Sequence, residues 1–154
     1  MIIRVETEGH LQQARTLFEE YADALGVDLS FQNFADELAN LPGDYAPPSG
    51  CLMLAVHEGQ AAGCIALRKI SGDICEMKRL FVRGGYRGHG FGRMLVQMII
   101  GEAQRLGYKQ MRLDTLSSMI EARALYRSFG FREIEPYRYN PIPGTSYMQL
   151  ALSE

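Results

Sequence analysis

The chain has little of several features that would place it in a specialised class of protein. It holds only three cysteines, an odd number with no C-x-x-C pair, which argues against a disulfide framework or a cysteine-bound metal. No apolar run approaches the ~20 residues of a membrane span, and the first residues lack the basic start and apolar stretch of a signal peptide. Cys51, Cys64 and Cys75 lie in apolar, strand-like runs, so we expect buried free thiols in a cytoplasmic protein without membrane contact.

A strong excess of charge of one sign is also missing. Sixteen Lys and Arg residues face 18 Asp and Glu residues, which gives a net charge of −2, whereas nucleic-acid-binding domains are usually strongly basic. The chain has 154 residues, 47% of them hydrophobic, and no internal repeat or low-complexity tract. That size suits one domain with a real core. We therefore expect a single soluble domain over residues 1–154 that does not bind nucleic acid.

Hydrophobic periodicity predicts an α/β protein with a mixed sheet of about seven strands and four helices. Connections as short as Glu58-Gly59-Gln60 indicate that three strands in the middle of the chain form an antiparallel meander. The later strand–helix–strand order predicts a right-handed crossover, which places the strand at Leu113 parallel to the strand at Leu80. We expect strands at residues 2–6, 52–57, 61–69, 74–82, 111–115, 131–134 and 147–152. We expect helices at residues 10–25, 91–106 and 119–129, and a further helix that follows Ser30 as its N-cap.

A glycine-rich loop precedes the third predicted helix. It reads Arg87-Gly88-His89-Gly90-Phe91-Gly92-Arg93, and its glycines let several backbone N–H groups converge at a helix N-terminus, where anions bind. The spacing differs from the dinucleotide motif G-x-G-x-x-G, and no G-K-[ST] follows for a P-loop. Between Met77 and Gly101 there are five Lys or Arg residues and no Asp or Glu. This pattern favours an anion site at the carboxyl end of a central strand; a flexible turn with solvated arginines is the alternative.

Two motifs around this loop resemble those of a known family. Arg87-x-x-Gly90-x-Gly92, after a strand that ends in Leu80-Phe81-Val82, resembles the acetyl-CoA-binding motif of the GNAT N-acetyltransferase superfamily. Ala122-x-x-Leu125-Tyr126-x-x-x-Gly130-Phe131 resembles that family's second motif, and element order and chain length match over essentially the whole chain. The resemblance implies acetyl-CoA as co-substrate, no metal, and a primary amine of a small molecule or peptide as acceptor.

The resemblance also implies which residues bind the cofactor. The main chain of Leu80, Phe81 and Val82 would hydrogen-bond the pantetheine arm, which lies between two central parallel strands that family members splay apart. Met119 stands where many members carry an asparagine that contacts the cofactor, and Ser117 or Ser118 is a candidate replacement. The backbone N–H groups that would hold the pyrophosphate belong to Arg87, Gly88, His89, Gly90, Phe91, Gly92 and Arg93.

Acetyl transfer to an amine requires that the ammonium lose a proton and that the leaving thiolate gain one. Tyr126 occupies the position of the family's tyrosine near the sulfur, which implies that its phenol protonates the thiolate; a core aromatic is the alternative. Glu76, eleven positions before Arg87, is similar to the glutamate base of those GNAT enzymes that use one. It could instead bind the substrate ammonium, or only pair with Lys78 or Arg112.

The acceptor pocket is the part on which the sequence says least. In family members, the region after residue 134 and the first two helices frame this pocket, and edge-strand packing is the alternative for the same residues. A non-catalytic acyl-CoA-binding sensor or structural protein is the rival to an enzyme, although it would need neither Glu76 nor Tyr126. Homodimerisation is common among such proteins, so a second copy is a candidate partner. The candidate substrate contacts are Phe31, Asp114, Tyr137, Tyr139 and Asn140.

Overall fold

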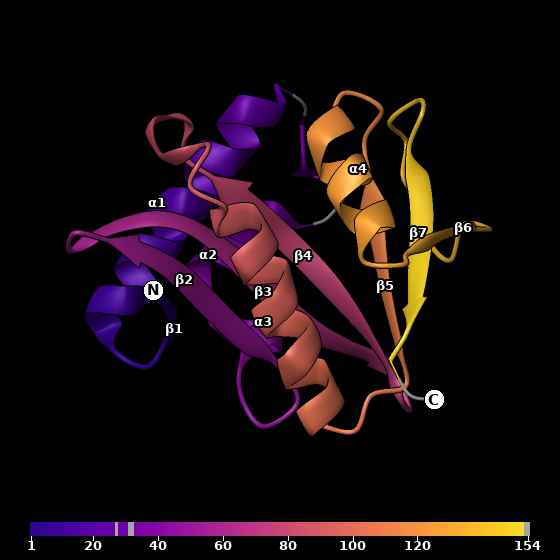
Figure 1. Cartoon of the computed structure of the whole chain (residues 1–154), viewed down its shortest axis with the longest axis horizontal. Coiled ribbons are helices and arrows are strands. Elements are labelled where there is room, and N and C mark those ends of the chain that lie inside the picture. The colour runs from indigo at the N-terminus through magenta and orange to yellow at the C-terminus, as the bar shows by residue number, and fades with distance from the viewer. Residues whose placement is uncertain (27, 31–32, 153–154) are drawn as a thin grey trace.

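The computed structural model describes residues 1–26, 28–30 and 33–152, and it confirms the mixed α/β architecture. Within these residues, seven strands form one sheet in the order β1-β2-β3-β4-β5-β7-β6 (Figure 1). The strands are β1 (Ile2–Arg4), β2 (Cys51–His57), β3 (Gln60–Ser71), β4 (Ile74–Val82), β5 (Gln110–Thr115), β6 (Arg132–Ile134) and β7 (Ser146–Ala151). The helices are α1 (Glu8–Leu25), α2 (Phe34–Ala39), α3 (Phe91–Arg105) and α4 (Ile120–Ser128), with 3-10 turns η2 (Gly43–Tyr45) and η3 (Gly84–Tyr86).

Helix ends follow local capping chemistry. The Thr7 hydroxyl accepts a hydrogen bond from the His10 N–H at 3.1 Å, so α1 begins two residues before the predicted start. The prediction of Ser30 as the N-cap of the second helix is wrong, because α2 begins at Phe34 with Asn33 as N-cap. The Ser30 N–H donates to the Asp28 carboxylate at 2.8 Å, which holds Ser30 in a turn instead.

No helix in the described ranges is long and apolar enough to cross a bilayer.

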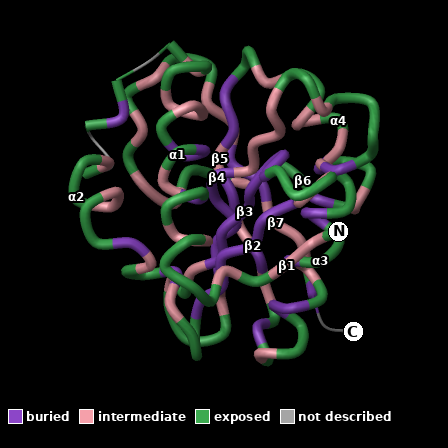
Figure 2. Tube along the Cα trace, turned by 90° about the vertical axis from the view of Figure 1, so that its left-hand side faces the viewer, coloured by how far each residue is buried: buried purple, intermediate pink, exposed green. Residues whose placement is uncertain are grey.

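The sheet separates two hydrophobic cores. Figure 2 shows that the buried residues concentrate in the central strands. On one face, α3 packs Leu95, Val96 and Ile99 against the strands. On the other face, α1 packs Leu17 and Phe18 against β2 and β3. The central strands are buried on both faces, which explains their nearly continuous apolar runs.

The three cysteines sit in these strands. Cys51, Cys64 and Cys75 are free and buried, as the sequence predicts. Burial raises the pKa of the Cys51 thiol to about 11 and that of the Cys75 thiol to about 12.

The two central parallel strands diverge. β4 and β5 pair only over Ile74–Glu76 and 110–112, although β4 continues to Val82. Figure 1 shows the two strands separating from that point onward. The main chain at Leu80 to Val82 therefore faces a widening space between the strands.

A β-bulge at Arg79 reorders the second half of β4. Lys78 pairs with Ala66 and Phe81 pairs with Cys64, so two β4 residues stand opposite one residue of β3. Arg79 has a φ of 63°, the left-handed conformation that a non-glycine residue rarely adopts. Arg79 pairs with Glu37 of α2 and Lys78 lines a cavity against α2, so both consecutive cations face the α2 side of the sheet.

Candidate active site

A cleft of about 630 Å³ opens where β4 and β5 diverge. The end of β4, the glycine loop, the first turn of α3, the start of α4 and the end of α1 surround it. All the residues predicted to bind the cofactor line this cleft except His89 and Arg93. Ser118 and Met119 line it too, at the position that the second motif assigns to a cofactor contact.

Glycine shapes the loop at the mouth of this cleft. Gly88 has a φ of 87° and Gly90, the N-cap of α3, has a φ of 79°, both in the region that favours glycine. A Cβ built on Gly90 meets no other atom of the chain within 4 Å, so the space beside it is open toward the cleft. The loop therefore presents backbone N–H groups and a helix N-terminus to whatever enters.

The side chains of His89 and Arg93 turn away from the cleft. The His89 ring stacks on Phe91 with centroids 5.8 Å apart and lies 5.2 Å from His57. The Arg93 guanidinium lies over the Phe129 ring and donates to the Ser128 hydroxyl at 3.1 Å. From the sequence, a cofactor role is predicted only for their backbone N–H groups, and that role stays a prediction.

The positive charge around the loop is smaller than the sequence suggests. Arg79 makes two hydrogen bonds to the Glu37 carboxylate, and Arg83 makes two to the Glu20 carboxylate. Of the five cations in the acid-free segment, these two are neutralised by partners from α1 and α2, which is a correction to the sequence interpretation. Arg87 lines the cleft.

Tyr126 lies at the deep end of this region. It lines a small cavity of about 30 Å³ together with Tyr21, Leu80 and Met119, which also line the cleft. Burial raises the pKa of the Tyr126 phenol above its ordinary value, so the hydroxyl keeps its proton at neutral pH. Asp114 and Lys78 line the same small cavity.

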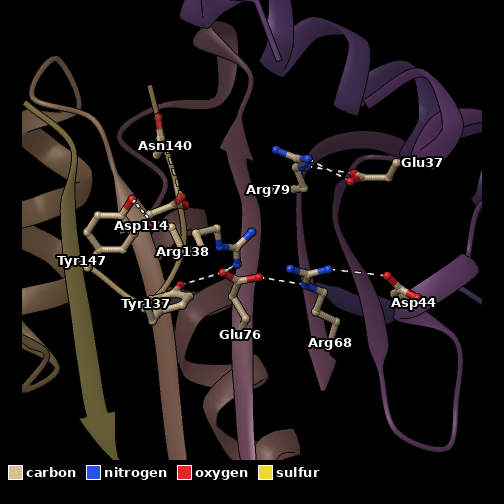
Figure 3. Close-up of polar contacts among 10 residues, drawn as sticks. All are labelled: Glu37, Asp44, Arg68, Glu76, Arg79, Asp114, Tyr137, Arg138, Asn140 and Tyr147. Carbon is tan, nitrogen blue, oxygen red and sulfur yellow. Dashed lines mark hydrogen bonds and ion pairs between the residues drawn. The ribbon is translucent and has the colours of Figure 1, made fainter. Parts of the chain in front are cut away.

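Glu76 is fully buried inside a network of donors (Figure 3). One carboxylate oxygen accepts from the Arg68 Nε at 2.8 Å. The other accepts from the Tyr137 hydroxyl at 2.6 Å and forms an ion pair with the Arg138 guanidinium. The sequence suggests Lys78 or Arg112 as alternative partners of Glu76. The ion pairs that Glu76 forms are instead with Arg68 of β3 and Arg138 of the loop after β6.

A second cavity, of about 390 Å³, lies on the α2 side of the sheet. We call it the acceptor cavity because α2 and the loop after β6, which the sequence resemblance assigns to an acceptor pocket, form part of its walls. η2, β3 and β4 form the remainder, and Arg68, Lys78 and Arg138 line it. Lys78 lines both this cavity and the small cavity at Tyr126. Burial and the neighbouring Arg79 lower the pKa of Lys78 to about 7.

Of the predicted substrate residues, Asp114 lines the small cavity at Tyr126, whereas Tyr137 and Asn140 line none of these three cavities. Tyr139 lines the acceptor cavity and is 78% exposed. Tyr137 contacts Glu76, and the Asn140 amide donates to the Asp114 carboxylate at 3.2 Å (Figure 3). Phe31 lies outside the described residues.

Sequence reasoning missed Arg68, Arg138 and the position of Lys78. In the sequence, Arg68 is a polar residue near the end of a predicted strand, and Arg138 is one residue of a Tyr-rich loop. Neither position indicates a contact with Glu76. A buried carboxylate such as Glu76 needs cationic partners, and that requirement is the signal that could have prompted a search for them. The described residues contain no group of three His, Cys, Asp or Glu side chains that could hold a metal.

Comparison with known proteins gives a consistent result. Residues 12–131 match the sequence model of the Acetyltransferase (GNAT) family. An uncharacterized N-acetyltransferase of Schizosaccharomyces pombe is 45% identical, with 99% of this chain and 95% of that protein covered. A GNAT-family acetyltransferase structure from Staphylococcus aureus Mu50 superposes with a TM-score of 0.83 over 99% of both chains at 21% identity. A GNAT-family acetyltransferase from Elizabethkingia anophelis, solved with acetyl-CoA bound, has a TM-score of 0.57 at 25% identity, covering 67% of this chain and 76% of that one.

Proposed function

This chain belongs to the GNAT family of acetyltransferases, and from that premise we propose that it transfers the acetyl group of acetyl-CoA to a primary amine. The observation that carries the proposal is that three neighbouring spaces share lining residues. The cleft at the glycine loop shares residues with the small cavity at Tyr126, and that cavity shares Lys78 with the acceptor cavity. This arrangement supports a reaction beside Tyr126, with donor and acceptor on opposite sides of it.

In this proposal the cofactor is held mainly by backbone. The N–H groups from Arg87 to Arg93, together with the N-terminus of α3, bind the pyrophosphate. The edge of β4 at Leu80 to Val82, beyond its pairing with β5, hydrogen-bonds the pantetheine arm as a neighbouring strand would. The thioester then reaches the small cavity at Tyr126.

The transfer proceeds by direct attack. The free amine attacks the thioester carbon, and the tetrahedral intermediate collapses as the C–S bond breaks. Tyr126 gives its proton to the leaving thiolate and regains one from the nitrogen of the intermediate through water. Lys78 takes the earlier proton from the substrate ammonium and releases it to solvent. Of the three ammonium protons, one remains on the amide, one replaces the Tyr126 proton and one is released.

We assign Glu76 a positioning role in this reaction rather than that of the base. Both of its oxygens accept bonds from Arg68, Tyr137 or Arg138, and its side chain has no exposed surface. A base needs a lone pair directed at the substrate proton. Glu76 instead fixes two cations at the wall of the acceptor cavity.

The proposal is tested by incubating the protein with acetyl-CoA and a broad panel of amines and peptides. Released thiol and the mass of the acetylated product are followed together, since product mass separates transfer from thioester hydrolysis. We expect acetylation of at least one amine well above a heat-inactivated control. Tight coenzyme A binding without any acetylated product would contradict the proposal.

A further inference from the structure

The acceptor cavity carries an unbalanced set of charges on its inner wall. The side chains of Arg68 and Arg138 are 29% and 22% exposed, and Lys78 is 8% exposed. Two guanidinium groups share the single carboxylate of Glu76 (Figure 3). Burial and the nearby Arg68 lower the pKa of Arg138 to about 10.

The acidic residues around the cavity do not remove this imbalance. Glu37 is occupied by Arg79 through hydrogen bonds of 2.9 and 2.8 Å. Asp44 lies 3.5 Å from Arg68, but its side chain is 79% exposed, where solvent weakens an ion pair. Asp36 is exposed on α2. The two guanidinium groups of Arg68 and Arg138 therefore share one buried carboxylate, that of Glu76.

Building on the proposed function, we infer that the acceptor is a free amino acid. Its carboxylate binds at the guanidinium groups of Arg68 and Arg138, and its amine points to Lys78 and the thioester. A guanidinium fork matches the two oxygens of a carboxylate, and such charge-assisted bonds are strong in a partly buried site. The volume of about 390 Å³ accommodates a small ligand of this kind.

The experiment compares each L-amino acid with its own primary amide as acceptor at pH 7. The amide keeps the amine and the side chain but loses the negative charge. Its amine is also less basic, so chemistry alone favours the amide and cannot produce a preference for the acid. We expect the best amino acid to exceed its amide in kcat/KM at least about 10-fold, as the loss of a charged hydrogen bond predicts.

Two variants show whether Arg138 is the source of that preference. Arg138→Gln should lower kcat/KM for the amino acid about 10-fold or more and leave the value for the amide within about 3-fold. The amide thus serves as the internal control for folding and catalysis. Arg127→Gln is the matched control, because Arg127 is an exposed arginine that pairs with Glu133 at the surface.

The outcomes separate this inference from the proposed function. If amides or simple amines such as putrescine are acetylated as efficiently as amino acids, the proposed acetyltransferase activity stands and the inference of an amino-acid acceptor is wrong. If Arg138→Gln lowers kcat/KM equally for the amino acid and its amide, Arg138 has only a structural role and the inference is overturned. If the protein binds coenzyme A and acetylates none of these amines or any peptide, the proposed function fails, and this inference fails with it.

Discussion

The cleft at the glycine loop and the acceptor cavity are built in different ways. The cleft takes its polar groups from the backbone of one continuous segment, with glycines at positive φ beside a helix N-terminus. The acceptor cavity takes its polar groups from side chains of α2, β3, β4 and a loop near the end of the chain. A backbone site tolerates most side-chain changes except at its glycines, whereas a site built from paired charges responds to the loss of any one of them.

The largest expected effect lies where the two regions meet. Tyr126→Phe removes the proton donor, and a general acid typically contributes 10²–10⁴-fold, so we expect kcat to fall by about that factor. Coenzyme A affinity, measured by calorimetry, should stay unchanged, because the phenol hydroxyl lies beyond the backbone groups that hold the cofactor. Tyr108→Phe is the control: its hydroxyl donates to the Ser49 carbonyl far from the cleft and affects stability alone. Equal kcat values in the two variants would rule out Tyr126 as the acid.

A change confined to the acceptor side should leave the cofactor side intact. Glu76→Gln removes the buried counter-charge of Arg138 and leaves Arg68 only the exposed Asp44. The loss of one partner from a buried ion pair costs about 3 kcal/mol of unfolding free energy. We expect lower stability in urea and a higher acceptor KM, with unchanged coenzyme A affinity. Glu133→Gln, at a surface ion pair, is the control. A fall in kcat of about 100-fold with normal KM and stability would instead identify Glu76 as the base.

The reverse test changes the cofactor side alone. Gly90→Ala places a Cβ in the open space beside the loop and forces a φ of 79° on alanine. Such strain costs about 1–3 kcal/mol, which corresponds to about a 5- to 150-fold weaker Kd for coenzyme A. The matched control is Gly84→Ala, since Gly84 lacks a positive φ and also faces open space. If Gly90→Ala binds coenzyme A as tightly as wild type, the loop is not the cofactor site.

The smallest expected effect is a pH dependence at the junction. Lys78 has a pKa of about 7, which burial, Arg79 and Arg68 lower. Asp114 and Glu37 act in the opposite direction. The neutral amine accepts the substrate proton, so acetylation should rise as pH increases through 7 and level off above it. The ratio of wild-type to Lys78→Met rates from pH 6 to 8.5 removes the acceptor's own titration. A ratio that is independent of pH would contradict the role of Lys78.

The same contrast explains what could be predicted from the sequence. The glycine loop and its helix could be predicted because adjacent residues carry the whole sequence pattern. The position of Tyr126 followed from the second motif for the same reason. The acceptor cavity could not be predicted, because Arg68 and Arg138 reach Glu76 from positions 8 and 62 residues away along the chain.

The bulge in β4 is a second feature that could not be predicted from the sequence. Strict alternation along β4 places Lys78 and Arg79 on opposite faces of the sheet. A positive φ at Arg79 breaks that alternation, and no glycine or asparagine marks the position. Pairing with Glu37, from a helix over 40 residues away, compensates the strain, and such long-range compensation leaves no local signal.

The buried thiols have a practical consequence for every experiment that follows coenzyme A release. Cys51, Cys64 and Cys75 are at most 4% exposed and hold their protons, so a thiol reagent added to the folded protein should react with the free cofactor first. The cysteines become reactive only when the strands around them separate. Their slow modification therefore records how often the sheet opens, and one reagent measures both the turnover of the enzyme and the lifetime of its fold.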